Sequence, residues 1–382
     1  MKNKRIFLII IVGCCFFACF YFLNKKYDRF YRIAGIDNEK RQMILTYLNE
    51  EEMDYLVENS IDSNRFMKYI ELEDFKIQHL SYYELLEKKN RPFLNDSHLL
   101  KFTNELITKI EEKTSKNIKN HFTRLVKYDL DELFMQSETF NLNLTNFYNV
   151  YKADKATIKL TDIDLLNAIY SSFELLEFSS QDRTEFMQLW QDVYSLETIS
   201  RFLEEKIQNP NLELVQYPDS LTAIIGENQT ISSYVPEPLS IPYEVSRTSF
   251  GMYLRQDAAT NLEKLYSASC KAVNDETLLL VGAYQSYDSM VSKYENSDLS
   301  IKPGCDEFQL ALSVDLSVLN IDYQQFANTK TYGYLKDHAW EYGFIQRYED
   351  NPHVYRFVGE NVAKLINEKQ MTLEEYEGVS DE

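Results

Sequence analysis

The sequence predicts an α+β C-terminal domain, preceded by an all-α region and by one N-terminal transmembrane helix. Three observations support this fold class. Residues 6–23 form a run of 18 uncharged, almost wholly apolar residues. Residues 24–209 contain very little Gly or Pro, and their apolar side chains recur at spacings of three to five positions, which is typical of amphipathic helices. Residues 210–377 mix short strand and helix patterns without strict alternation, as α+β domains do.

The apolar run at residues 6–23 is just long enough to cross a membrane, since a helix rising about 1.5 Å per residue needs ~20 residues to do so. Basic residues flank it on both sides, so charge alone does not fix its orientation. We expect residues 1–5 to be a cytoplasmic stub and the rest of the chain to be extracytoplasmic. A cleaved signal peptide and a chain lipidated at Cys14 are the alternatives. The run has no polar cleavage region and continues well past Cys14, which favours an uncleaved cell-membrane anchor.

The charge balance limits the partners that the protein can bind. The 382 residues include 60 acidic and 40 basic side chains, a formal net charge of −20. Six of the basic residues and one of the acidic ones lie within residues 1–29, so the remainder carries 34 basic and 59 acidic side chains, or −25. A nucleic-acid-binding protein needs a basic face, and this composition excludes one. It also favours a protein or a neutral peptide over an anionic polymer as partner.

Cysteine and histidine usage gives no local metal motif and no disulfide framework. Cys14, Cys15 and Cys19 lie inside the apolar run, which leaves Cys270 and Cys305 either as one bridge or as two free thiols. No two histidines have the spacing of a paired ligand motif. The five histidines are His79, His98, His121, His338 and His353.

Residues 24–209 form the acidic helical region. After Asn209-Pro210 the residue pattern changes from helix-type to strand-type, and we place the domain boundary there. Two stretches, near residues 53–70 and 130–150, each show an acidic helix followed by an aromatic cluster. They are either diverged helical repeats or ordinary acidic amphipathic helices, and base rates favour the second interpretation.

After residue 210 the sequence predicts a series of short strands and helices, followed by an acidic tail at residues 378–382. Strands are expected where β-branched and other apolar residues cluster, and helices where the period is close to four. The predicted strands are 277–282, 310–316 and 354–359, and the predicted helices are 258–272, 288–294, 334–342 and 360–368.

Several motifs occur in one order along the C-terminal part: YVPEPL from Tyr234, AYQSY from Ala283, PGCDEFQLALSVDL from Pro303 and PHVYRFVG from Pro352. In these motifs, over about residues 230–377, the chain resembles the zinc D-alanyl-D-alanine carboxypeptidases of the VanY type, peptidase family M15. The resemblance implies that residues 210–377 form a domain with the fold of that family.

The resemblance also implies a site: a zinc ion held by two His and one Asp, a Glu as general base, and an Arg that anchors the substrate. Only Asp315 keeps its residue type. Phe308 and Val354 stand at the His positions and have no metal-ligand atom. Asn351 stands at the base position and Gln285 at the Arg position; the first accepts no proton and the second carries no charge. We therefore predict no catalytic residue, no bound metal and no cofactor. The predicted vestigial cleft comprises Gln285, Phe308, Asp315, Asn351, His353 and Val354.

A rearranged zinc site is the alternative. His353 and Glu307 are each one residue from a lost His position, and together with Asp315 they would give three ligands. Neighbouring residues of a strand point to opposite faces, so His353 is expected to face away from the direction of Val354. Such a site would need a bulge in one element and a register shift in the other.

These features predict a membrane-anchored extracytoplasmic pseudo-carboxypeptidase, a non-catalytic binding or scaffolding protein in peptidoglycan metabolism. Its expected partner is a peptidoglycan stem peptide or a cell-envelope protein. Two alternatives stay open: an active carboxypeptidase with the rearranged zinc site, and a purely structural protein-interaction module.

Overall fold

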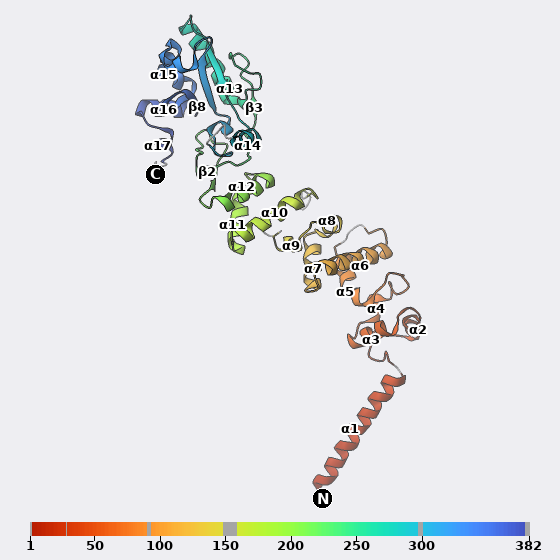
Figure 1. Ribbon diagram of the computed structural model, residues 1–382. Coiled ribbons are helices and arrows are strands. Elements are labelled where there is room, and N and C mark those ends of the chain that lie inside the picture. The colour runs from red at the N-terminus through yellow and green to blue at the C-terminus, as the bar shows by residue number, and fades with distance from the viewer. Residues whose placement is uncertain (1, 28, 90–92, 148–158, 297–300, 379–382) are drawn as a thin grey trace. The chain divides into compact units, whose positions relative to one another are not determined.

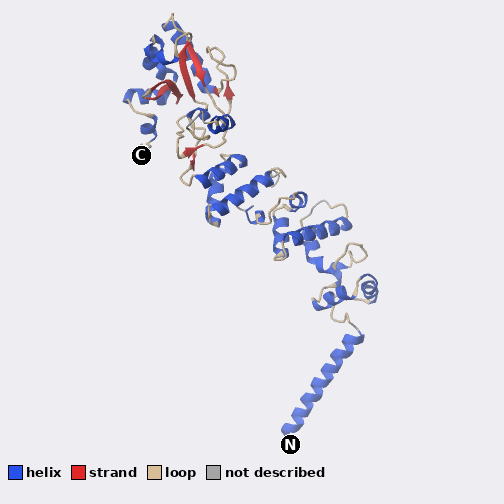
Figure 2. Cartoon of the chain, in the orientation of Figure 1, coloured by secondary structure: helices blue, strands red, loops and turns tan. Residues whose placement is uncertain are grey.

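The computed structural model describes residues 2–27, 29–89, 93–147, 159–296 and 301–378. These residues form two compact units, one ending by residue 160 and the other beginning at Thr161. Within the described residues, strands occur only in the second unit, where Figure 2 shows them in red. The predicted fold class is confirmed: a helical region precedes an α+β domain. Tyr148 and Val150, part of the second predicted repeat, and residues 379–382 of the tail lie outside the described residues.

The described residues of the first unit form helices joined by turns and loops, with no strand among them. α1 contains Ile6–Leu23, whose mean hydropathy of 2.9 and length suit a membrane span, although a signal sequence has the same properties. Side-chain caps begin several of the other helices; Asn49 and Glu52 form a capping box at α3, for example. The helices are α1 (Lys2–Tyr27), α2 (Asn38–Tyr47), α3 (Glu50–Glu58), α4 (Ser63–Phe66), η1 (Ile77–His79), α5 (Leu80–Glu87), α6 (Asp96–Lys113), α7 (Ile118–Lys127), α8 (Asp131–Gln136) and α9 (Leu144–Phe147).

Three further helices open the second unit: α10 (Asp162–Leu175), α11 (Ser180–Trp190) and α12 (Leu196–Gln208). The stacked rings of Phe186 and Phe202, with centroids 6.0 Å apart, join α11 to α12. The Tyr194 hydroxyl donates to the Val215 carbonyl at 2.6 Å, which ties these helices to the segment beyond residue 210. They therefore pack with the sheet domain, and the boundary near residue 210 stays a prediction drawn from sequence texture.

A four-stranded antiparallel sheet forms the centre of the second unit (Figure 1). Its order is β5-β6-β8-β7, with β5 at Leu278–Gly282, β6 at Ser313–Val318, β7 at Phe344–Tyr348 and β8 at Asn351–Phe357. Two small two-stranded sheets precede it in the chain. They pair β1 (Glu213–Leu214) with β2 (Gln229–Thr230), and β3 (Leu239–Ser240) with β4 (Leu254–Arg255).

Helices surround this sheet, and two apolar clusters hold them to it. The larger cluster joins α13 and α15 to the sheet through residues such as Leu262, Leu316 and Leu335; the smaller one packs Ile345 against Ile366. The helices are α13 (Gln256–Ala272), α14 (Tyr287–Glu295), η2 (Glu307–Leu310), η3 (Tyr323–Asn328), α15 (Lys330–His338), η4 (Ala339–Tyr342), α16 (Glu360–Lys369) and α17 (Leu373–Glu377).

Three predicted elements differ from those observed. The strand predicted at 354–359 is β8, Asn351–Phe357, which begins and ends earlier. The strand predicted from residue 310 begins at Ser313, because a 3₁₀ turn precedes it and ends at Ala311, whose φ of 55° is left-handed. The helix predicted at 334–342 begins earlier, at Lys330, because the Thr329 side chain caps it. Its last four residues form the separate turn η4, which ends at Gly343 with φ 80°.

Candidate functional site

Strand register and one backbone hydrogen bond place the predicted cleft residues. Asp315 on β6 pairs with Val354 on β8, so their side chains share one face of the sheet. On its other side Asp315 pairs with Gly282 of β5. A Cβ at Gly282 would meet the Asp315 Cβ at 3.0 Å, so the glycine permits this close approach. Phe308 lies on η2, and its carbonyl accepts a hydrogen bond from the Gln285 amide at 3.4 Å.

A side chain that the sequence analysis did not identify donates a hydrogen bond to the Asp315 carboxylate. The Tyr323 hydroxyl lies 2.9 and 3.0 Å from its two oxygens and donates a hydrogen bond to it. Partial burial raises the pKa of Asp315 above its ordinary value of 3.8, and the Tyr323 hydrogen bond and the nearby His353 offset part of that rise. Burial and the same carboxylate raise the pKa of Tyr323, which stays a neutral donor.

His353 is a buried packing residue. Its ring lies parallel to that of Tyr323, with centroids 3.7 Å apart, and stacks on Phe326 at 4.9 Å. Its Nδ1 is 2.9 Å from the Leu316 carbonyl oxygen, and only 8% of the residue is exposed. The second histidine near this part of the sequence, His338, lies with Glu341 on an exposed surface.

Glu307 belongs to a buried ion network. Its carboxylate pairs with Arg356 and lies 3.4 Å from the Arg347 Nε, and it accepts a hydrogen bond from the Ser313 hydroxyl at 3.0 Å. Burial alone would raise its pKa, but the two guanidinium groups outweigh burial and lower it. Arg347 also donates to Glu374 of α17, with nitrogen–oxygen distances of 2.5 and 3.1 Å. Through these ion pairs Glu307 links η2 to β7 and β8.

The remaining two cleft positions, Gln285 and Asn351, both accept hydrogen bonds. The Gln285 Oε1 accepts hydrogen bonds from the Lys293 ammonium at 2.6 Å and from the Ser289 hydroxyl at 3.4 Å. Lys293 thus brings to Gln285 a positive charge that the motif comparison did not reveal. The Asn351 Oδ1 accepts from the backbone amide of His353 at 3.1 Å, which shapes the start of β8.

These residues do not fit a zinc ion. Phe308 and Val354 have no donor atom, the Asp315 oxygens accept from a tyrosine, and Glu307 is paired with arginines. Across the described ranges, no group of three His, Cys, Asp or Glu side chains could hold a metal. Cys270 and Cys305 are two free thiols and do not form a disulfide bridge.

Similar solved structures include that of the LdcB LD-carboxypeptidase and that of VanYB in complex with D-alanine-D-alanine. The first is 28% identical, covers 44% of this chain and 91% of that chain, and has a TM-score of 0.40. The second is 21% identical, covers 42% of this chain and 98% of that chain, and has a TM-score of 0.33.

Two curated proteins are similar in sequence. A protein from Bacillus subtilis (strain 168) that carries the name carboxypeptidase YodJ is 28% identical over 211 residues, 48% of this chain and 76% of that protein. A D-alanyl-D-alanine carboxypeptidase from Enterococcus faecalis (strain ATCC 700802 / V583) is 31% identical over 102 residues, 24% of this chain and 37% of that protein. No family model matches the chain.

The α+β fold and these relatives define the C-terminal part as a peptidoglycan-related, carboxypeptidase-like domain. In this part the chain is similar to carboxypeptidases of the VanY-type family, as the ordered motifs predict. That the functional positions of the family are replaced in this chain stays a prediction from the motifs.

Proposed function

We propose that this protein is a membrane-anchored, extracytoplasmic pseudo-carboxypeptidase that binds a peptidoglycan stem peptide without hydrolysing it. One observation carries the proposal. Asp315, the only position that keeps the ligand residue of the family, accepts a hydrogen bond from Tyr323, while its neighbours in the pattern are Phe308 and Val354. The Tyr323 hydroxyl therefore takes the hydrogen-bonding position at the carboxylate that a metal ion would need.

The other chemical requirements of hydrolysis are absent from the same positions. A general base must accept a proton from the attacking water, and the amide of Asn351 does not do so at neutral pH. The rearranged alternative needs Glu307 as a ligand, and breaking its buried pairs with Arg356 and Arg347 would cost about 3–5 kcal/mol. This cost favours binding without catalysis over an active enzyme with a rearranged site.

The ligand follows from the relatives, one of which is named a D-alanyl-D-alanine carboxypeptidase. A stem peptide ending in D-alanine is the ligand that a retained scaffold of this family would hold. In this proposal α1 anchors the protein, so that the full chain stays with the membrane after an alkaline wash whereas residues 24–382 alone do not.

Zinc content and D-alanine release of the detergent-solubilised full chain test the proposal. We expect substoichiometric zinc after incubation with the metal, no D-alanine release from a pentapeptide ending in D-Ala-D-Ala, and saturable binding of that peptide. Stoichiometric zinc, with release abolished by both Asp315→Asn and His353→Ala, would show that the protein is an active enzyme. Absence of peptide binding would leave only the structural interaction module.

A gain-of-function variant sharpens the test. Phe308→His, Val354→His and Tyr323→Phe together supply two imidazoles beside Asp315 and remove the hydroxyl that occupies it. We expect this variant to bind about one zinc per chain because three donors then meet. The matched control, Val235→His with Phe250→His, changes two exposed residues and should bind no more zinc than the unaltered protein. Equal zinc in both variants would contradict our placement of Tyr323 at the former metal position.

A further inference from the structure

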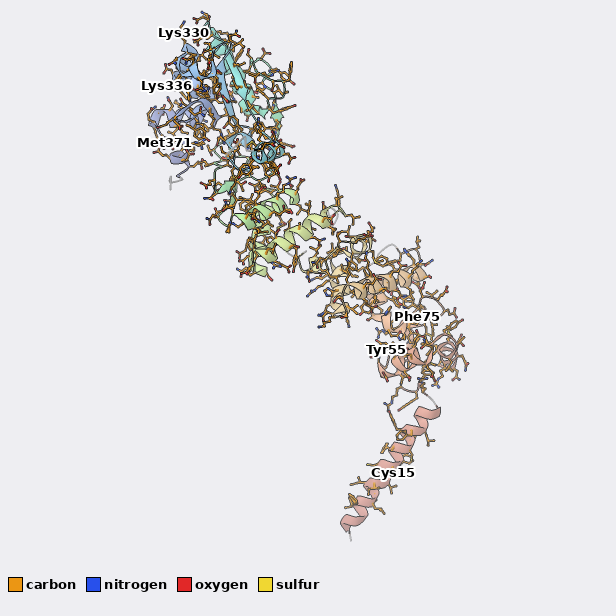
Figure 3. The ribbon with its side chains drawn as sticks, in the orientation of Figure 1. Cys15, Tyr55, Phe75, Lys330, Lys336 and Met371 are labelled. Atoms are coloured by element: carbon orange, nitrogen blue, oxygen red, sulfur yellow. The ribbon has the colours of Figure 1, made fainter. Side chains whose placement is uncertain are left out.

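Two exposed aromatic rings lie on the segment that runs along the β5 edge of the central sheet and leads into β4. Phe250 is 87% exposed and Tyr243 is 70% exposed. The other outer strand, β7, adjoins a groove of about 650 Å³ whose lining includes Lys336 and Met371, both labelled in Figure 3. The aromatic pair lines no part of that groove and is a separate surface feature of the domain.

Backbone hydrogen bonds fix the segment that carries the rings. The Leu280 amide of β5 donates to the Ser246 carbonyl at 2.8 Å, and the Thr248 amide donates to the Leu280 carbonyl at 3.1 Å. Two residues beyond Phe250, the side chain of Met252 is buried in the larger apolar cluster. Phe250 therefore stands between two anchored points, so that a ligand covering it pays little for ordering the backbone.

The Arg247 guanidinium holds the two rings near each other. Its Cζ lies 5.7 Å from the centre of the Tyr243 ring and 5.9 Å from the centre of the Phe250 ring, within the range of cation–π attraction. Hydrogen bonds from its Nη1 to the carbonyls of Pro242, Tyr243 and Val245, at 2.9, 3.1 and 3.3 Å, fix the guanidinium in turn. A fixed cation thus keeps both rings in place although they are exposed.

The same segment ends beside the predicted cleft. The Tyr284 amide donates to the Tyr253 carbonyl at 3.1 Å, and the residue after Tyr284 is Gln285 of the predicted cleft. Phe250 precedes Tyr253 by three residues, so their Cα atoms lie within about 11 Å of each other. The aromatic pair is therefore within reach of a ligand that extends out of the cleft on this side.

The chemistry around the rings favours an uncharged carbohydrate. Glu244, Thr248 and Ser249 are exposed beside them, so polar groups surround the two ring faces. A protein interface needs about 800 Å² from each partner, more than two aromatic side chains supply. Anionic lipid headgroups are repelled by a chain of net charge −20. A pyranose ring has a face of C–H groups and a rim of hydroxyl groups, so it stacks on an aromatic face and hydrogen-bonds to polar neighbours.

We propose that Tyr243 and Phe250 form a stacking platform for the glycan to which the stem peptide is joined. The choice of this glycan rests on the proposed function, since a stem peptide held in the cleft is joined to it. A chain of N-acetylglucosamine and N-acetylmuramic acid carries no charge where each lactyl carboxyl forms the amide bond to a stem peptide. It therefore avoids the repulsion that an acidic surface imposes on an anionic polymer.

Calorimetric titration of the full chain with tetra-N-acetylchitotetraose, an uncharged oligomer of N-acetylglucosamine, tests the platform. The detergent must lack a sugar headgroup, because such a headgroup would compete. We expect saturable binding that Phe250→Leu and Tyr243→Leu each weaken about fivefold, the factor for about 1 kcal/mol of lost ring contact. Phe250→Tyr keeps the ring and should keep the affinity. The control Tyr47→Ala removes an exposed ring from α2 and should leave binding unchanged.

A muropeptide, which carries glycan and stem peptide in one molecule, tests whether platform and cleft act together. We expect it to bind at least about tenfold more tightly than the free stem peptide, because linking two contacts raises the effective concentration of the second. Phe250→Leu should remove this advantage and leave the affinity for the free stem peptide unchanged.

Four results would contradict the proposal. No binding of the oligomer, or equal affinity of the unaltered protein and Phe250→Leu for it, would exclude ring stacking. A muropeptide advantage that persists in Phe250→Leu would place the glycan elsewhere. Self-association that Phe250→Leu abolishes would assign the rings to a second copy of the chain. Failure of the proposed function gives a different pattern, in which the oligomer still binds and the free stem peptide does not.

Discussion

The pair of Asp315 and Tyr323 is the residue-scale feature on which the proposed function depends. A half-buried carboxylate needs a hydrogen-bond donor, and here the donor is the Tyr323 hydroxyl at 2.9 Å. We expect Tyr323→Phe to lower the free energy of unfolding by about 1–3 kcal/mol, because the carboxylate loses its donor. Urea denaturation measures this change. The control Tyr243→Phe removes a hydroxyl from a residue that is 70% exposed and should change stability by less than about 0.5 kcal/mol. Equal effects of the two substitutions would mean that the hydrogen bond does not stabilise the fold.

The raised pKa of Asp315 predicts a pH dependence at the same residue. Between its ordinary value of 3.8 and its higher pKa in the folded protein, the folded state binds more protons than the unfolded state. Stability from this group therefore falls as pH rises through that window. Asp315→Asn keeps an acceptor for Tyr323 and removes the titration, so the variant should gain thermal stability relative to the unaltered protein as pH rises. Melting temperatures from pH 3.5 to 7 measure the difference, and a difference independent of pH would contradict this assignment.

At the scale of elements, the network around Glu307 joins η2, β7, β8 and α17. Arg356 is fully buried and Arg347 nearly so, and removing the carboxylate between them leaves two guanidinium groups poorly compensated. We expect Glu307→Gln to cost about 3–5 kcal/mol in unfolding free energy. The control Glu368→Gln changes an exposed residue of α16 and should cost less than about 0.5 kcal/mol.

The pH dependence of stability that Glu307 contributes is opposite in direction to that of Asp315: stability from Glu307 falls as the pH falls. The pKa of Glu307 is lowered below its ordinary value of 4.5, so its stabilisation is complete above 4.5 and is lost as pH falls through the lowered pKa. Denaturation of the unaltered protein and of Glu307→Gln should therefore converge at low pH. A constant gap between the two curves down to pH 2 would indicate that the network stabilises the fold without titrating.

Across the whole molecule, sequence patterns predicted what depends on local periodicity or on motif order. Helices such as α13 and α16 and the strand β5 lie within a few residues of their predicted bounds, since each carries its own apolar period. The motifs alone predict replaced functional residues at 308, 351 and 354, and this stays a prediction. Tyr323 was not predicted, because it reaches Asp315 from the turn after β6 and no spacing rule links the two.

The extent of the folded C-terminal domain is the remaining whole-molecule question, since sequence texture changes near residue 210 while the compact unit begins at Thr161. Contacts cross position 210 at several points: Tyr194 donates to Val215, Arg201 lies 3.4 Å from Asp288, and Ser233 donates to Thr198 at 3.2 Å.

Removing residues 161–209 would break these contacts and uncover apolar side chains, each worth about 1.5–3 kcal/mol when fully buried. A fragment of residues 210–382 should therefore melt at a lower temperature than one of residues 161–382 and bind more of a hydrophobic dye. Differential scanning calorimetry of the two fragments measures this. Equal melting temperatures would place the domain boundary near residue 210 and make α10–α12 an independent element, whereas the expected difference would extend the carboxypeptidase-like unit to include these helices.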